Sequence, residues 1–121
     1  MSGNIKYDKW INDDNSENYK CRAWVNFDGL GTVSIREAGN VSSITDFGSG
    51  DYFVNFTTAM LDVNYCIQSG VHGRDNENMG VFVDAFNNIT SPTTTSVRIM
   101  ARRTDTHAYL DVTAVHVAIF R

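Results

Sequence analysis

Residue types that commonly build active sites are scarce in this chain of 121 residues. It has two cysteines, three histidines and one proline, and no two histidines lie two or four positions apart. Histidines at those spacings would direct two imidazoles at one metal ion from a strand or a helix. A G-x-S-x-G elbow, a P-loop and a G-x-G-x-x-G fingerprint are also missing. The sequence therefore predicts no catalytic site, no metal site and no cofactor.

Long apolar runs and clustered positive charge are missing as well. No apolar run approaches the roughly 20 residues that span a bilayer, so we expect no membrane insertion. The first 20 residues are polar and lack the apolar core of a secretory signal. The net charge is −4 and the chain has only three lysines, whereas nucleic-acid binding needs clustered Lys and Arg. We therefore expect no nucleic acid among the partners.

Strand-forming residues dominate what is present. From residue 20 onward Val, Ile, Thr, Phe and Tyr recur in short runs separated by Gly, Asn and Asp, the pattern of strands joined by turns. The spacing favours an antiparallel sandwich or barrel. We predict an all-β fold, an antiparallel β-sandwich of about eight strands over residues 20–121, preceded by a polar N-terminal arm over residues 1–19. The expected strands are 20–28, 31–36, 41–47, 51–57, 64–71, 80–86, 95–102 and 110–120.

The last expected strand, 110–120, carries apolar residues on both faces. Val115, Val117 and Ile119 line one face, while alanines and Phe120 make the other face mostly apolar. A strand that is apolar on both sides is covered on both sides. We therefore predict a subunit contact that uses Val115, Val117, Ile119 and Phe120. A closed barrel, or an N-terminal arm laid over the strand, are the alternatives.

Two aromatic residues and one polar loop are the candidates for binding. Trp24 and Tyr109 could stack on sugar rings, and they could equally be core or interface anchors. The loop at 71–78 collects polar side chains that could bind a cation or sugar hydroxyls, although a solvated loop is the plainer interpretation. Its candidate residues are His72, Arg74, Asp75 and Glu77. A disulfide between the two cysteines stays open, with two isolated, partly buried thiols as the default.

The string "CRAWVNFDGLGTVSIREAGNVSSITDFGSGDYFVNFTTAMLDVNYC", residues 21–66, is the most distinctive part of the chain. It carries the pattern R-A-W-V-N-F-(N/D)-G, then I-R-x-(S/A)-x-N-V-S-S-I-T-D-x-G-x-G-x-Y-x-V-x-F-x-x-A-M. In this pattern it resembles a segment of tail-fibre and related virion proteins of tailed bacteriophages. Leu61 stands where a proline would be expected, which we interpret as drift in a turn.

The resemblance implies a β-rich module at the tip or shaft of a fibre. It implies a homotrimer that contacts other virion proteins and, as a receptor, a bacterial surface glycan. It also implies a place in the phage tail, after synthesis in the host cytoplasm, and no enzymatic activity. Our functional prediction is therefore a virion structural protein that takes part in assembly and host attachment. The alternative is a freestanding, monomeric carbohydrate-binding module, and a polysaccharide hydrolase is the weakest candidate.

Overall fold

The computed structural model describes residues 3–4, 6, 8–17, 19–72, 81–85 and 92–121, with the backbone alone for residues 72 and 81–85. Within these ranges the chain forms eight strands and no helix, and every strand pairing is antiparallel. This confirms the predicted all-β, antiparallel class. The strands are β1 (Cys21–Asp28), β2 (Ser34–Gly39), β3 (Val41–Gly48), β4 (Asp51–Phe56), β5 (Cys66–His72), β6 (Val81–Ala85), β7 (Ser96–Arg103) and β8 (Ala114–Phe120).

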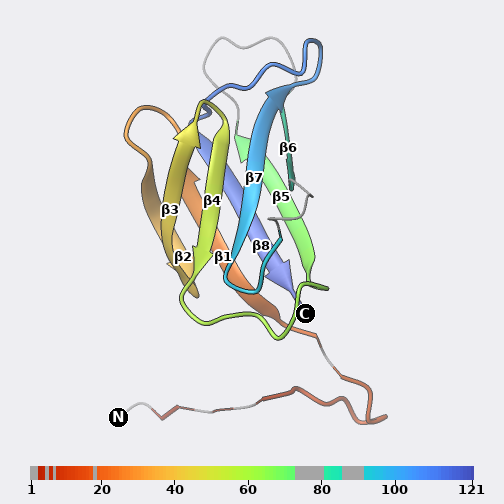
Figure 1. The fold of residues 1–121 in the computed structure, drawn as a ribbon. Coiled ribbons are helices and arrows are strands. Elements are labelled where there is room, and N and C mark those ends of the chain that lie inside the picture. The colour runs from red at the N-terminus through yellow and green to blue at the C-terminus, as the bar shows by residue number, and fades with distance from the viewer. Residues whose placement is uncertain (1–2, 5, 7, 18, 73–80, 86–91) are drawn as a thin grey trace.

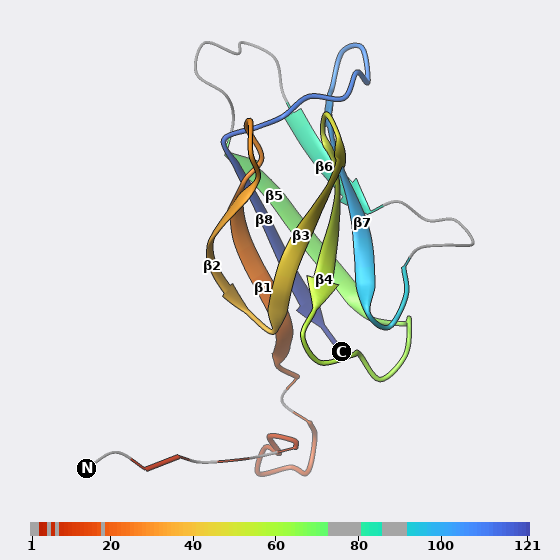
Figure 2. The same cartoon turned by 60° about the vertical axis from the view of Figure 1, so that its left-hand side comes forward.

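The strands form two four-stranded sheets, in the orders β2-β1-β8-β5 and β3-β4-β7-β6. The sheets lie face to face like the layers of a sandwich, and the chain changes sheet between β2 and β3, β4 and β5, β5 and β6, and β7 and β8 (Figure 1, Figure 2). We call this part of the molecule the two-sheet body. The connection between β4 and β5, the start of β1 and the C-terminus lie at one end, which we call the base.

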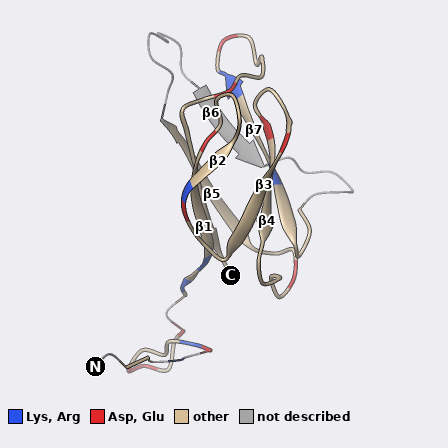
Figure 3. Cartoon of the chain, turned by 90° about the vertical axis from the view of Figure 1, so that its left-hand side faces the viewer, with Lys and Arg blue, Asp and Glu red and all other residues tan. Residues whose placement is uncertain are grey.

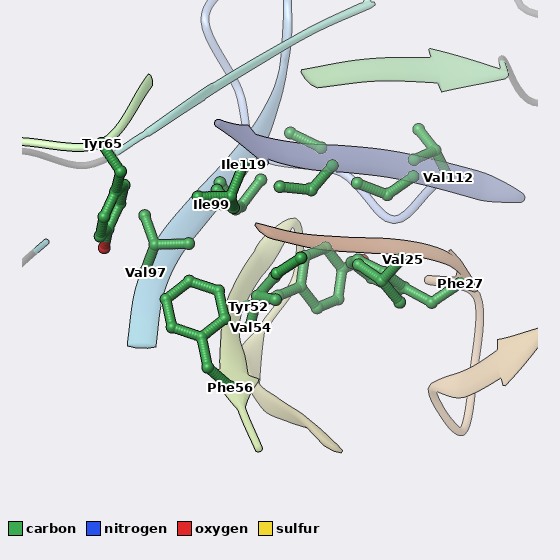
Figure 4. Packing of buried hydrophobic residues seen from close by; sticks show 14 of the residues in the cluster. Val25, Phe27, Tyr52, Val54, Phe56, Tyr65, Val97, Ile99, Val112 and Ile119 are labelled. Carbon is green, nitrogen blue, oxygen red and sulfur yellow. The ribbon is translucent and has the colours of Figure 1, made fainter. Parts of the chain in front are cut away.

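The core between the sheets is built by residues that alternate along the four central strands. Side chains two residues apart in a strand point to the same face, so each strand contributes every second residue. On β4 the buried residues are Tyr52, Val54 and Phe56, with partly exposed residues between them. Figure 4 shows these side chains facing those of the opposite sheet. The other strands contribute Ala23, Val25, Phe27, Val97, Ile99, Ala101, Val115, Val117 and Ile119.

The placement of β8 corrects the sequence-based assignment of its valines and isoleucine to a subunit contact. Val115, Val117 and Ile119 are 0%, 3% and 0% exposed and belong to the core of the chain itself. The physical reason is the strand alternation, which turns all three toward the opposite sheet. Phe120 points the other way and is 36% exposed at the base.

Two strands begin three or four residues later than predicted, and in both cases a connection takes up the first residues. β2 begins at Ser34 because Gly31 adopts a positive φ of 57° in the turn, which L side chains rarely tolerate. β8 begins at Ala114 because residues 110–113 cross from one sheet to the other. There the Leu110 N–H donates to the carbonyl of Ala101 at 3.2 Å, and the carbonyl of Val112 accepts from the Gly29 N–H at 2.9 Å.

The N-terminal arm has little regular structure. Ile11 and Glu17 form an isolated bridge, closed by a hydrogen bond of 2.8 Å from the Asn12 N–H to the carbonyl of Ser16. The arm leads away from the base in both views (Figure 1, Figure 2). Trp10 and Ile11 are therefore exposed, although both are large apolar residues.

Candidate functional site

A shallow groove of about 380 Å³ crosses the outer face of the β2-β1-β8-β5 sheet. Its volume lies within the range of small-molecule sites, about 300–1,000 Å³. Strands β1, β8 and β5 supply its walls and floor. We call it the sheet groove and define it by Trp24, Asn26, Gln68, Gly70, His116 and Ala118.

The strand register assembles these residues in two rows across the sheet. In one row Ala118 on β8 is paired with Trp24 on one side and Gln68 on the other. In the second row His116 is paired with Asn26 and with Gly70 in the same way. Neighbouring strands lie about 4.8 Å apart, so each row spans about 10 Å. Since paired residues share a face, all six side-chain positions are directed outward.

Trp24 forms one wall of the groove and lies over a glycine. Gly39 is the partner of Trp24 on β2, and a Cβ atom at Gly39 would collide with the indole ring. The missing side chain lets the ring rest on the backbone of β2. Trp24 nevertheless remains 42% exposed, although tryptophan is highly buried on average in folded proteins.

The polar groups of the groove make few hydrogen bonds to the described part of the chain. Asn26 Oδ1 accepts a bond of 3.4 Å from Arg36, which leaves Asn26 Nδ2 without a partner in the described ranges. Gln68 Nε2 makes only a contact of 3.5 Å to Cys66 Sγ. The exposed His116 imidazole makes no hydrogen bond to any described residue. The groove therefore offers both donors and acceptors to a ligand.

Charged side chains lie beside the groove and satisfy one another. Arg36 donates to the carbonyl of Thr113 at 2.7 Å and lies 3.7 Å from the carboxylate of Asp28. Among the described residues, no Asp, Glu, Lys or Arg belongs to the lining of the groove. Over the rest of the described chain, acidic and basic residues are interspersed (Figure 3). The described lining of the groove thus has no acidic or basic side chain of these four types, and the charged residues beside it are already engaged by other groups of the chain.

The outer face of the other sheet carries an aromatic cluster that is closed on itself. Phe47 and Phe53 meet edge to face, with ring centroids 5.5 Å apart. The Arg98 guanidinium lies 5.0 Å from the Phe47 centroid and donates to both oxygens of Asp51 at 2.8 and 2.6 Å. The hydrogen bond to Asp51 holds the pKa of Arg98 above its usual value. Because the members of this cluster bind each other, we interpret it as structural.

The structure brings only one of the predicted binding residues to the groove. Trp24 lies there, whereas Tyr109 lies on the outer face of the other sheet, where its hydroxyl donates to Met100 Sδ at 3.4 Å and its ring faces Arg102. The core separates the two aromatic residues. The predicted loop residues Arg74, Asp75 and Glu77, and the side chain of His72, lie outside the described residues.

Sequence reasoning missed Asn26, Gln68 and His116 as groove residues. Each is a polar residue next to a core residue on its strand, so alternation could have placed Asn26 and His116 on outer faces. Their proximity to one another depends on the pairing of β1 and β5 with opposite edges of β8. That pairing joins Asn26 to His116, 90 positions away in the chain, which no local pattern reports.

Large apolar side chains gather at the base of the molecule. Leu61 is 81% exposed and Tyr19 is 69% exposed. We define the base surface by these two residues with Trp10, Ile11, Val63 and Phe120, all of them exposed. A hollow of about 530 Å³ between the arm and the two-sheet body includes Tyr19 and Leu61 in its walls.

Ion pairs lie near the base surface. Arg121 donates to both oxygens of Asp62 at 3.0 and 2.9 Å, and this hydrogen bonding lowers the pKa of Asp62 to about 2. Glu17 in the arm lies 3.8 Å from Arg22 at the start of β1. Charged side chains that are held in ion pairs therefore lie near the apolar residues of the base.

Metal and thiol chemistry find little support in the described part of the chain. Among those residues, no group of three or more His, Cys, Asp or Glu side chains could hold a metal ion. Cys21 and Cys66 are free and exposed, rather than partly buried as expected. Both pair with Phe120, from opposite sides of β8, so this strand separates them. None of the described segments is a helix long and apolar enough to cross a membrane.

Comparison of the chain with models of protein families, with curated proteins and with solved structures finds no match. The groove and the base surface must therefore be interpreted from their own geometry.

Proposed function

We propose that this chain is a virion structural module of a tailed bacteriophage, of the tail-fibre kind. In this proposal it forms a homotrimer, contributes to assembly and attaches the particle to the host surface, without catalysis. The observation that carries the proposal is the base surface. The resemblance of residues 21–66 to tail-fibre proteins supplies the biological setting.

The base surface supports self-association because it is apolar, exposed and confined to one end. Its six side chains come from the arm, from the β4–β5 connection and from the end of β8. Fully burying a large apolar side chain contributes about 1.5–3 kcal/mol. Exposed large apolar side chains, where they form a patch, mark interaction sites on soluble proteins. A symmetric contact between copies would bury the arm residues Trp10 and Ile11 together with Leu61.

Three copies joined at their bases suit attachment to a surface. The two-sheet bodies then project away from the shared end and present three copies of every exposed site. Linked sites raise the effective concentration for the second and third binding events, so weak single sites give firm attachment. Such a mechanism needs a rigid scaffold and no tuned pKa values.

The test is the absolute mass in solution, measured by light scattering on a sizing column. We expect about three times the 13.5 kDa of one chain. Leu61→Asp should reduce the mass to that of a monomer, because a charge in a buried apolar contact is costly. Leu30→Asp is the matched control, since Leu30 is an exposed leucine in the β1–β2 turn at the opposite end. A wild-type monomer at all concentrations would overturn the trimer.

A freestanding carbohydrate-binding module is the second candidate. The sheet groove favours it, because its exposed Trp24 and unbonded polar groups do not require a second subunit. A clean monomer that binds glycans would establish this candidate in place of the first.

A further inference from the structure

We propose that the sheet groove binds one neutral pyranose ring of a glycan, held against Trp24 and above Ala118 and Gly70. The inference rests on the proposed attachment function for its biological setting. The groove alone would make the contacts to the sugar.

The apolar elements of the groove fit the C–H face of a sugar ring. Trp24 offers the larger part of an aromatic face, because Gly39 lets its ring lie on β2 and leaves it 42% exposed. The floor is made of the smallest side chains, Ala118 and Gly70. A Cβ atom placed at Gly70 would meet no atom within 4 Å, so open space stands above this residue. The pyranose ring can therefore approach the backbone of β5 and β8.

The polar elements of the groove fit hydroxyl groups. A sugar hydroxyl both donates and accepts, and binding it requires partners of both kinds. Asn26 offers the donor Nδ2 to a ligand, because its Oδ1 already accepts a hydrogen bond from Arg36. Gln68 adds a carboxamide on the opposite side, and His116 adds an imidazole between them. Asn26 and Gln68 lie on the two strands that flank β8, and His116 lies on β8 itself beside Ala118, so all three groups border the open floor at Ala118 and Gly70.

The absence of charge in the lining selects for a neutral ligand. A carboxylate or sulfate sugar would lose hydration on entering the groove without gaining an ion pair, which is unfavourable. Arg36 is the nearest cation to Asn26, and Asp28 and the Thr113 carbonyl already engage it. We therefore assign hexoses and N-acetylhexosamines to the groove, and not acidic sugars.

The experiment is a titration of the full chain, followed through the side-chain N–H signals of Trp24, Asn26 and Gln68 by NMR. The probes are methyl glucoside, galactoside, mannoside and N-acetylglucosaminide at millimolar concentration. Glucuronate and N-acetylneuraminate are the acidic comparison. We expect saturable shifts of these signals with at least one neutral probe, and at least tenfold weaker binding of both acidic probes.

Gly70→Val is the decisive variant. Its Cβ enters open space and valine favours strands, so the fold should be retained while the new side chain fills the groove. We expect loss of the saturable shifts. Trp24→Ala should weaken binding about tenfold, since an aromatic contact is removed. Tyr109→Ala is the control, because it deletes an exposed aromatic on the other sheet and should leave binding unchanged.

Three results would overturn the assignment. One is no saturable shift with any neutral probe, and another is unchanged binding in Gly70→Val. The third is a shift of the same signals with protein concentration alone, which would place a second copy in the groove. Binding of a single ring does not depend on the number of subunits. A trimer without sugar binding therefore refutes only the groove, and a monomer with sugar binding refutes only the trimer.

Discussion

Tyr52 shows at the scale of one residue how a polar atom is held inside the apolar core. Its side chain is fully buried, and its hydroxyl lies 2.8 Å from Asp111 Oδ1 and 3.0 Å from the carbonyl of Gly29. Asp111 Oδ1 also accepts from the Gly50 N–H at 2.9 Å. A single hydroxyl thus joins β4 to the connections that follow β1 and β7. Burial first, and then the bond to Asp111, raise the pKa of Tyr52 above its ordinary value.

Removing this hydroxyl should destabilise the chain without changing its core volume. In Tyr52→Phe the partly buried carboxylate of Asp111 loses one hydrogen bond and keeps the one from the Gly50 N–H, and a hydrogen bond to a charged group contributes about 1.5–3 kcal/mol. We expect the free energy of unfolding in urea to fall by that amount. Tyr19→Phe removes a hydroxyl from an exposed ring and should change nothing. Equal stability of Tyr52→Phe and wild type would show that the connections following β1 and β7 are held by other contacts.

Strand β8 shows at the scale of an element how two apolar faces serve two purposes. Its inner face, with Val115, Val117 and Ile119, packs in the core. Its outer face carries Ala118, which lies in the floor of the sheet groove, and His116 next to it. β8 is central in its sheet, between β1 and β5, so both of its edges are paired. The double apolarity noticed in the sequence is therefore explained by a core on one side and an open groove on the other.

Charges placed at neighbouring positions of β8 should have opposite consequences. Val117→Asp buries a charge in the core and should cost more than about 4 kcal/mol, enough to unfold many small domains. Ala118→Asp places the same charge on the outer face and should leave the far-UV circular dichroism spectrum intact while it blocks the groove. Chemical denaturation of the two variants compares them directly. Comparable unfolding of both would contradict the assigned faces.

The proposed contact between copies and the proposed ligand site lie apart at the scale of the whole molecule. The base surface lies at the end where the arm and the C-terminus meet, and the sheet groove lies on the side of the two-sheet body. Contact between copies at the base therefore leaves the groove open to solvent.

Each end of the two-sheet body contains a buried tyrosine whose hydroxyl group is hydrogen-bonded. Tyr52 lies at the end far from the base, and Tyr65 lies near the base, where its hydroxyl donates to the carbonyl of Thr93 at 2.8 Å.

The molecule should have an alkaline limit set by these tyrosines. Burial raises the pKa of Tyr65 from 10.0 to about 12, and the pKa of Tyr52 is raised as well. The unfolded chain then releases the tyrosine protons at a lower pH than the folded chain, so stability falls as pH rises. We expect the contribution of Tyr65 to be complete below pH 10 and to be lost between about pH 10 and 12.

Thermal melts between pH 8 and pH 12 measure this dependence. The variant Tyr65→Phe should show a smaller loss over the same range, because one of the two protons is no longer linked to folding. The same slope in Tyr65→Phe and wild type would assign the alkaline limit to other groups.

The sequence by itself determined the class of the fold and the approximate positions of its strands along the chain. Alternating Val, Ile, Phe and Tyr, interrupted by Gly, Asn and Asp, predicted an antiparallel all-β chain because side-chain direction has a period of two in a strand. It also singled out Trp24 as an exposed aromatic residue. These are local properties, decided by neighbours in the chain.

Only the tertiary structure decided which faces are covered and which residues meet. The same alternation in β8 is compatible with a core or a subunit contact on either side, and only the packing of the second sheet placed Val117 inside. Asn26, Gln68 and His116 became one site because β8 pairs with β1 and β5 in a particular register. Register between distant strands arises from the packing of the whole core, and no short stretch of sequence contains it.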